Sequence, residues 1–332
     1  MKPRVAINGF GRIGRLALRA NLVNELLDIV VINDSQGAES AAHLLKYDSL
    51  YGELNADLKV EGDYLIVNGK KILVVSNRDP LALPWQEQQI DVVLECTGAF
   101  VDEKSAGQHL TAGAKKVVIS APGKGEMRTI CMGVNEETYN KETDHIISNA
   151  SCTTNCLTPV VKALHESFQI KRGMVSTVHS YTSTQNLVDG NNKDRRRARA
   201  AALNFFPNST GAKEALKVVY PAVAENFTGL SVRVPTPTVS LIDLVVELEK
   251  SVTENEINEM FRNYAQTKMA GILAVSDEQL VSSDFKGNPH SAIVDSEYTS
   301  VVGGNLVKVL AWYDNEWGYA NRLNELAAYV WG

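Results

Sequence analysis

The stretch Val5-Ala6-Ile7-Asn8-Gly9-Phe10-Gly11-Arg12-Ile13-Gly14 decides the fold class of this chain. A short apolar run passes into the pattern G-x-G-x-x-G, and Gly11–Val23 continues with helical spacing of apolar residues. The glycines allow a tight turn, a close approach of backbone to a pyrophosphate, and close contact between helix and strand. Such a pyrophosphate would lie on the helix N-terminus. The sequence therefore predicts a strand at Arg4–Ile7 and a dinucleotide site after it; the alternative is a glycine-rich turn in any α/β protein.

The adenosine end of this site is expected just after the next strand, Ile29–Ile32. Asp34 follows that strand about where an acidic residue binds the ribose hydroxyls, and this favours NAD. Its neighbour Ser35 is small and polar, so a 2′-phosphate is not excluded there. Arg78 can pair with such a phosphate, or it is an exposed surface charge.

The first half of the chain alternates short apolar runs with helical spacing. This alternation is typical of a parallel, doubly wound sheet of Rossmann type. The remaining elements expected there are strands at Tyr64–Val67, Ile72–Val75, Val92–Glu95, Lys116–Ser120 and His145–Ser148, and a helix at Ala106–Ala112. Short strands near Leu58–Val75 are expected to form an antiparallel insertion.

The second half of the chain has longer strands, and we expect a mostly antiparallel sheet. The strands expected are Met174–His179, Gly229–Val234, Leu241–Glu249, Ala292–Asp295 and Lys308–Trp312, and the helices are Glu254–Gln266, capped by Thr253, and Leu323–Val330. We therefore expect a dinucleotide-binding domain at 1–150 plus 316–332 and a catalytic domain at 151–315. The latter contains a long polar loop near 180–208, and loops of that length are usually functional or disordered.

Composition restricts the class of partner. The 332 residues are 44% apolar and 22% charged, which is ordinary for a soluble globular protein. A net charge of -6 gives no general attraction to nucleic acid or anionic membrane, and no apolar stretch is long enough to cross a bilayer. The four cysteines do not resemble a disulfide framework, and the chain enters a strand at once, with no room for a targeting peptide. We expect a cytoplasmic protein.

A second decisive stretch is Ser148-Asn149-Ala150-Ser151-Cys152-Thr153-Thr154-Asn155-Cys156. Ser151 is expected to cap a helix whose first residue is Cys152. Free backbone N–H groups and the helix dipole favour a thiolate there, which suits covalent catalysis. The alternative is a small buried residue at a helix start. A zinc site built from Cys152 and Cys156 is a weaker interpretation, because C-x-x-x-C has no second cysteine pair.

Histidine and anion-binding residues follow downstream. His179 ends a strand and, if it faces Cys152, can stabilise the thiolate and act as general base; a lone histidine is more often structural. Ser209-Thr210-Gly211 opens another helical run, which is a natural anion site. Donor-rich residues in this region that can bind two phosphates are Thr182, Thr184, Arg197, Thr210, Gly211 and Arg233.

These motifs together resemble phosphorylating glyceraldehyde-3-phosphate dehydrogenase. The resemblance covers essentially the whole chain and is carried by AINGFGRIGR, SNASCTTNC, HSYTSTQ, RRARAAALNFFPNSTGA, LSVRVPTPTVSLIDLVVELEK and WYDNEWGYANR. It implies that Cys152 attacks the aldehyde, that His179 moves the proton as hydride passes to nicotinamide, and that inorganic phosphate cleaves the thioester. It also implies a homotetramer. From the cysteine pattern, we expect no metal site.

The resemblance assigns roles to individual residues. Thr182, Thr184 and Arg233 would bind the phosphate of the substrate, and the attacking phosphate would be bound by Ser151, Thr153, Arg197, Thr210 and Gly211. The cofactor set from motif and resemblance together is Gly9, Gly11, Arg12, Ile13, Gly14, Asp34, Ser35, Arg78, Ser120, Asn191, Asn315 and Tyr319.

Cofactor choice is the point at which the pattern departs from strictly NAD-using members. Those commonly carry a hydrophobic residue at Ser35 and proline at Asn191, whereas both are polar here. The chain thus resembles the NADP-accepting photosynthetic branch in the polar character of these positions, but not in the identity of the residues there. It also has no acidic, cysteine-bearing tail after Gly332. We expect use of both NAD and NADP, with use of NAD alone as the alternative. The alternatives are erythrose-4-phosphate dehydrogenase, whose loop usually lacks the Tyr181-Thr182 pair, and a catalytically idle binding paralogue, against which the intact Cys152 and His179 argue.

Overall fold

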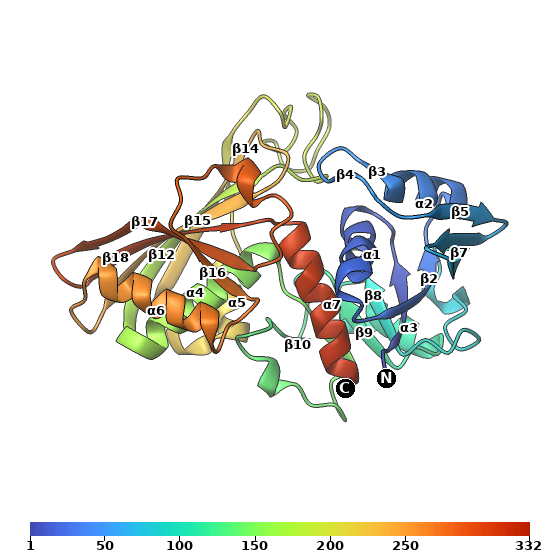
Figure 1. The fold of residues 1–332 in the computed structure, drawn as a ribbon, viewed down its shortest axis with the longest axis horizontal. Helices are drawn as coiled ribbons and strands as arrows, with labels where there is room; N and C mark the ends of the chain where they lie inside the picture. Colours follow the sequence, from blue (N-terminus) through green and yellow to red (C-terminus); the bar gives the residue numbers. More distant parts are fainter. The chain divides into compact units, whose positions relative to one another are not determined.

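A computed structural model describes every residue of the chain except the side chain of Ala212. The chain divides into two compact units, one formed by Met1–Ser151 with Tyr319–Gly332 and the other by Cys152–Gly318. Figure 1 labels the elements of both units.

The first unit is built on a nine-stranded sheet in the order β10-β11-β9-β8-β1-β2-β7-β6-β5. Its strands are β1 (Arg4–Asn8), β2 (Asp28–Asn33), β5 (Leu58–Glu61), β6 (Tyr64–Val67), β7 (Lys70–Val75), β8 (Val92–Glu95), β9 (Lys116–Ile119), β10 (Arg128–Thr129) and β11 (Ile146–Ser148). All neighbours from β10 to β7 run parallel, and β6 and β5 add antiparallel strands at the edge. The predicted doubly wound sheet with its antiparallel insertion is confirmed.

Strand β1 is the point at which the strand order reverses. β2 pairs with one edge of β1 and β8 pairs with the other. The strands that follow β1 directly in sequence therefore extend the sheet on one side of it, and later strands extend the sheet on the other side. The carboxyl ends of the strands at such a point border a crevice in doubly wound folds. Val5 and Ile7 pack into one apolar cluster and Ala6 into another, so both faces of β1 are buried.

The helices of the first unit cover these two faces. They are α1 (Arg12–Asn24), α2 (Gly37–Lys46), α3 (Glu103–Thr111) and α7 (Trp317–Trp331), whose residues from Tyr319 belong to this unit, with short 3-10 turns at Pro80–Ala82 and Glu136–Thr138 and a two-stranded ribbon of β3 (Tyr47–Asp48) and β4 (Gly52–Glu53). Helix α2 was not expected; it buries Ala41 and Leu45 on a narrow apolar stripe. Helix α7 begins six residues before the expected Leu323, because Asp314 Oδ1 accepts from the backbone N–H groups of Glu316 and Trp317 and caps it.

The second unit is built on a seven-stranded, mostly antiparallel sheet in the order β13-β14-β12-β15-β18-β17-β16. Its strands are β12 (Ile170–Ser180), β13 (Phe206–Ser209), β14 (Phe227–Val234), β15 (Ser240–Leu248), β16 (Leu273–Ser276), β17 (Ala292–Val302) and β18 (Leu306–Tyr313). The pairs β12–β14 and β16–β17 are parallel, and the other neighbours are antiparallel. The expected fold class of this half is therefore confirmed.

Three helices, α4 (Cys152–Phe168), α5 (Ala212–Val219) and α6 (Glu254–Gln266), lie along one side of this sheet in Figure 1, and two 3-10 segments are at Pro221–Asn226 and Ser282–Phe285. Thr253 caps α6 as expected, in a capping box with Glu256. The expected polar loop near 180–208 is shorter than predicted, because its end forms the edge strand β13. Pro207 concealed this strand from pattern analysis, since proline is tolerated only at sheet edges.

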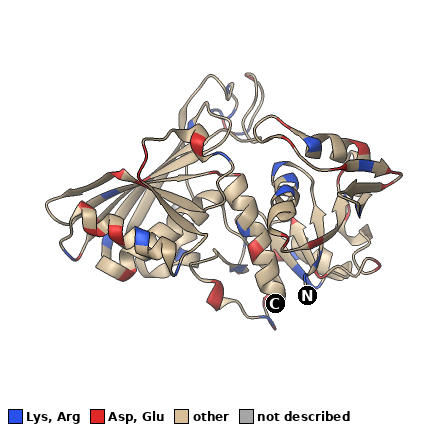
Figure 2. Cartoon of the chain, in the orientation of Figure 1, with Lys and Arg blue, Asp and Glu red and all other residues tan. Residues whose placement is uncertain are grey.

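Charged residues are interspersed over the elements of both units (Figure 2). Among the described residues, no helix is long and apolar enough to cross a membrane. The four cysteines are free thiols.

Candidate active site

The carboxyl ends of β1, β2 and β7 border a hollow of about 450 Å³ in the first unit. Its lining residues are Asn8, Gly9, Phe10, Gly11, Asn33, Asp34, Ser35, Asn77, Arg78, Pro80, Leu83, Cys96, Thr97, Ala99 and Phe100. We call this hollow the cofactor cradle. It brings together five residues that the sequence predicted to bind a dinucleotide, namely Gly9, Gly11, Asp34, Ser35 and Arg78.

The glycines of the turn fit the close approach that a pyrophosphate requires. Gly9 has a φ of 93°, a left-handed conformation that other residues rarely adopt. A Cβ on Gly14 would lie 2.2 Å from the Gly9 carbonyl oxygen, so helix α1 can approach the turn only because residue 14 is glycine. With Gly11 at the N-cap of α1, the turn has the shape of an anion-binding helix start. The residues present therefore fit a dinucleotide.

Other predicted cofactor residues lie outside this lining. The Arg12 guanidinium pairs with Asp48 and lies 5.7 Å from the centre of the Tyr51 ring. Ile13 and Gly14 lie in the first turn of α1, and the Ser120 backbone N–H donates to the Glu95 carbonyl. The Tyr319 hydroxyl donates to the Ala150 carbonyl. Asn191 and Asn315 belong to the second unit.

In the second unit, Cys152 and His179 lie side by side. Cys152 begins helix α4 as predicted, and His179 is on β12, one residue before the strand ends. The distance from Cys152 Sγ to His179 Nε2 is 3.4 Å, and His179 is 4% exposed. His179 Nδ1 lies 2.7 Å from the Ser180 carbonyl oxygen and donates to it in the tautomer that carries the proton on Nδ1. In that tautomer the Nε2 lone pair faces the thiol.

Arg233 is beside this histidine because β12 and β14 pair in parallel with His179 opposite Arg233. Arg233 Nη1 donates to the Ser180 carbonyl at 2.9 Å and lies 2.6 Å from His179 Nδ1. Burial first and the Arg233 charge second lower the pKa of His179 to about 3. His179 is thus a neutral base at physiological pH.

The helix start favours a thiolate at Cys152, but burial of the side chain acts more strongly in the opposite direction. Burial raises the pKa of the Cys152 thiol, and the Arg233 charge and the hydrogen bonds with Thr153 oppose this only in part. A helix N-terminus contributes about 0.3–1 kcal/mol near a surface, which is less than one pKa unit. The thiol therefore needs a base at the moment of attack, and His179 Nε2 is in place to supply it.

The predicted phosphate-binding residues fall into two hydroxyl-rich groups. Thr182 Oγ1 lies 2.9 Å from Thr184 Oγ1, and Arg197 donates to Thr184 Oγ1 at 3.0 Å, so these three form one cluster on the loop after β12. Half-buried Thr210 and exposed Gly211 lie at the start of α5, with Gly211 as the N-cap. This second group has the backbone N–H groups of a helix start.

Ser151 and Thr153 flank Cys152. Thr153 Oγ1 is hydrogen-bonded to the Tyr313 hydroxyl at 2.9 Å, and the Tyr313 ring stands edge-on to His179 with the centroids 6.1 Å apart. Ser151, the residue directly before the helix, is half-buried. These contacts place a tyrosine that the sequence did not indicate against His179 and against Thr153, the residue that follows Cys152.

Cys156 follows one helical turn after Cys152 and is fully buried. Burial raises the pKa of its thiol well above the usual value, so it is no second nucleophile at neutral pH. Across the described residues, no three His, Cys, Asp or Glu side chains are arranged to hold a metal ion.

Two serines orient Asn315, and sequence reasoning missed both. The Asn315 Oδ1 atom accepts from Ser180 Oγ at 2.9 Å and from Ser240 Oγ at 3.0 Å, which leaves the Nδ2 donors available. Ser240 follows β12 by 60 residues in sequence, so no local pattern marks the contact. This arrangement suits an amide that must donate to a carbonyl oxygen.

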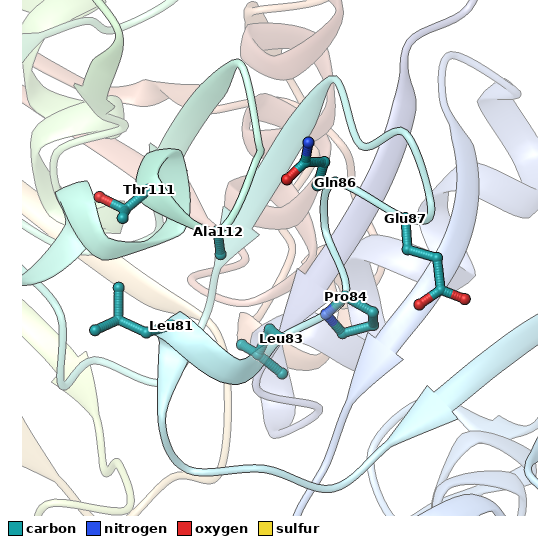
Figure 3. A pocket seen from close by; sticks show the side chains of 7 residues that line it. All are labelled: Leu81, Leu83, Pro84, Gln86, Glu87, Thr111 and Ala112. Carbon is teal, nitrogen blue, oxygen red and sulfur yellow. The ribbon is translucent and has the colours of Figure 1, made fainter.

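A second hollow of about 450 Å³ in the first unit has a different lining (Figure 3). Leu81, Leu83, Pro84 and Ala112 supply aliphatic surface, and Glu87 is its one charged residue. Phosphate recognition requires basic side chains or converging backbone N–H groups. This hollow therefore lacks the chemistry of the cofactor cradle.

Comparison with known proteins agrees with this geometry. Residues 3–103 match the family model of the glyceraldehyde 3-phosphate dehydrogenase NAD binding domain, and residues 151–315 match that of the C-terminal domain. The chain is 52% identical over 330 residues to glyceraldehyde-3-phosphate dehydrogenase 2 of Bacillus subtilis, covering 99% of this chain and 97% of that protein. Identity to glyceraldehyde-3-phosphate dehydrogenase of Geobacillus stearothermophilus is 52%, covering 99% and 98%.

A chloroplastic relative is equally similar. Glyceraldehyde-3-phosphate dehydrogenase A of Chlamydomonas reinhardtii is 53% identical over 330 residues, covering 98% of this chain and 88% of that protein. With two family models in the expected order and full-length identity above half, the chain belongs to the glyceraldehyde 3-phosphate dehydrogenase family.

Proposed function

We propose that this enzyme oxidises D-glyceraldehyde 3-phosphate to 1,3-bisphosphoglycerate, reversibly, with inorganic phosphate as second substrate and NAD(P) as hydride acceptor. The observation that carries the proposal is the 3.4 Å contact between Cys152 Sγ and His179 Nε2, with Arg233 beside the histidine. A nucleophile, a neutral base and a fixed cation thus meet in one place, as acyl transfer from a phosphorylated aldehyde requires.

The neutral His179 starts the reaction by taking the thiol proton as sulfur attacks the aldehyde carbon. It returns that proton to the resulting oxyanion, so that a thiohemiacetal forms on Cys152. His179 then removes the hydroxyl proton as hydride leaves the same carbon, which produces the thioester. The bound nicotinamide supplies the hydride acceptor. Phosphate attacks the thioester carbonyl and expels the Cys152 sulfur, which is reprotonated from His179.

Positioning of the two phosphates is the task of the hydroxyl and arginine groups. We assign the substrate phosphate to Thr182, Thr184 and Arg233, and the attacking phosphate to Ser151, Thr153, Arg197, Thr210 and Gly211. The 2.9 Å and 3.0 Å contacts among Thr182, Thr184 and Arg197 support adjacent sites that share one donor cluster. Asn315 would donate its Nδ2 to the nicotinamide carboxamide, with Tyr319 nearby.

The first test is Cys152→Ser. A serine hydroxyl forms no thioester, so phosphate-dependent NAD(P)H production should fall to background. Cys156→Ser is the matched control, because this buried thiol donates at 3.9 Å to the Ala311 carbonyl and contacts no reacting group in the proposal. Substantial residual activity in Cys152→Ser with the fold intact would end the thioester mechanism.

Cofactor choice is proposed to be dual. Ser35 and Arg78 line the cofactor cradle together with Asp34. The Asp34 carboxylate can therefore bind the ribose hydroxyl of NAD, and the Arg78 guanidinium can bind the 2′-phosphate of NADP.

The proposal also includes a cytoplasmic homotetramer that acts in central carbon metabolism, and we assign Asn191 a contribution to cofactor choice. Steady-state kinetics with NAD and NADP should show both used, with Arg78→Ala raising the KM for NADP about tenfold and sparing NAD. An Arg78→Ala enzyme with unchanged KM for NADP would show that Arg78 does not bind the 2′-phosphate. Likewise, unchanged NADP use in Asn191→Pro would show that Asn191 does not contribute to cofactor choice.

A further inference from the structure

Six polar residues, all but Thr97 buried, form a hydrogen-bond network beside the cofactor cradle. We call it the Glu95 network, and its members are Asn8, Asn33, Trp85, Glu95, Thr97 and His109. They come from the carboxyl ends of β1, β2 and β8, from helix α3, and from two loops. Glu95 and His109 have no exposed surface, and Asn8 is 1% exposed. A carboxylate buried this deeply requires several donors.

Both oxygens of Glu95 have donors. Oε1 accepts from the backbone N–H of Thr97 at 2.7 Å and from the Thr97 hydroxyl. Oε2 accepts from Asn8 Nδ2 at 2.5 Å and lies 3.0 Å from His109 Nε2. The carboxylate is thus held by its near neighbour Thr97, by His109 on helix α3 and by Asn8, which is 87 residues away in sequence.

The indole of Trp85 determines which nitrogen of His109 carries the proton. Trp85 Nε1–H donates to His109 Nδ1 at 3.0 Å, so Nδ1 is an acceptor. In the neutral ring the proton is then on Nε2, where it is donated to Glu95. Trp85 therefore acts on Glu95 through the tautomer of His109.

The network extends from Glu95 to both ends of the cradle. Thr97 packs against the phosphate turn, because a Cβ on Gly9 would lie 2.7 Å from Thr97 Cγ2 and 2.8 Å from its backbone nitrogen. In the other direction, Asn8 accepts from Asn33 Nδ2 at 2.7 Å. Asn33 exchanges two hydrogen bonds with the backbone of Asn77, which precedes Arg78. The Glu95 carboxylate is therefore connected both to the glycine turn expected to hold the pyrophosphate and, through Asn8 and Asn33, to the loop at the adenosine end of the cradle.

We infer that Glu95, with His109 as its support, is a positioning residue for the dinucleotide, and this inference rests on the proposed cofactor. Glu95 does not line the cradle. Its removal leaves the buried donors on Asn8 and His109 without an acceptor, together with the backbone N–H of Thr97, and each unsatisfied group costs free energy. The strand ends can relieve that cost only by moving, and movement widens or narrows the cradle.

The experiment is calorimetric titration of wild type and Glu95→Gln with NAD and with ADP-ribose, which lacks nicotinamide. The substituted amide keeps the size of the side chain but places an NH2 group against donors. The Kd should rise about tenfold or more for both ligands alike. In steady state, the KM for NAD should rise by a larger factor than kcat falls.

Three further variants separate positioning from stability. Asn21→Leu removes a buried amide that pairs with Leu27 in the same unit, so it should lower Tm and leave the Kd unchanged. His109→Gln keeps a donor for Glu95 and should bind NAD more tightly than His109→Leu, which has none. In Trp85→Phe, 15N NMR of the imidazole should show loss of the fixed Nε2–H tautomer, together with weaker NAD binding.

Glu95→Gln with the wild-type Kd for NAD, or equal Kd values for His109→Gln and His109→Leu, would overturn the inference while leaving the proposed function intact. Failure of wild type to bind either NAD or NADP would instead overturn the proposed function, and this inference with it. If Glu95→Gln does not fold, the two His109 variants decide the question on the same criterion.

Discussion

Arg233 has two roles at the scale of single residues, because it holds the pKa of His179 down and is the proposed anchor of the substrate phosphate. In Arg233→Gln the pKa of His179 should rise from about 3 but stay below its ordinary value, since burial, the first cause, persists. The loss of one charge-assisted contact, about 1.5–3 kcal/mol, should raise the KM for glyceraldehyde 3-phosphate roughly 10- to 100-fold.

NMR titration of His179 and kinetics with glyceraldehyde, which has no phosphate, check the two roles separately. Kinetics with glyceraldehyde should be far less affected than with the phosphorylated substrate. Arg233→Lys is the control that keeps the positive charge and loses the planar fork. An Arg233→Gln enzyme with unaltered KM for glyceraldehyde 3-phosphate contradicts the anchor role.

Residue-scale prediction from sequence succeeded where a local pattern carries the signal. Cys152 at a helix start and Gly9 in a strand-to-helix turn were found in this way. The raised pKa of Cys152 was not, because burial depends on the rest of the fold. The contact of Asn8 with Glu95 spans 87 residues of sequence, and no short motif marks it.

Helix α6 provides a test at the scale of the element. Its capping box joins the Thr253 hydroxyl to the Glu256 backbone N–H and the Glu256 carboxylate to the Thr253 backbone N–H. Thr253→Ala leaves orphan donors at the helix start and should lower the free energy of unfolding by about 1 kcal/mol. Urea denaturation measures this change, and kcat/KM should be unaltered.

Thr253→Ser is the matched control for this cap, because it keeps the hydroxyl and should retain most of the stability. A Thr253→Ala protein that unfolds at the wild-type urea concentration would mean that the cap contributes nothing here.

Elements with strong periodicity were predicted, and elements dependent on tertiary contacts were not. Buried strands such as β1 and β8 show their apolar runs directly. Helix α2 buries only Ala41 and Leu45, and β13 contains Pro207, so both have weak patterns. The early start of α7 depends on the Asp314 side chain, whose other contacts, to Thr238 and Gly287, come from distant loops.

The stability of the whole molecule should depend on pH through His179. Its pKa is about 3 in the folded chain and ordinarily about 6.5, so between these values the unfolded state binds the extra proton. This group's contribution is complete above pH 6.5 and is lost as pH falls toward 3. From pH 7 to pH 5 the loss should be about 2 kcal/mol.

Urea denaturation of wild type and His179→Asn at these two pH values isolates this effect, because all other titrating groups are common to both proteins. The variant should lose less stability than wild type on acidification. Equal losses in the two proteins would contradict the pKa assignment.

The pairing of β12 with β14 also sets the spacing between two groups of the proposed site. His179 is opposite Arg233 in the strand register, and neighbouring strands in a sheet lie about 4.8 Å apart. In the proposed reaction, the base and the arginine of the phosphate anchor are therefore held in register by backbone hydrogen bonds, and the loop that follows β12 adds Thr182 and Thr184 to the anchor. A change in the β12–β14 register would then displace the anchor relative to the base.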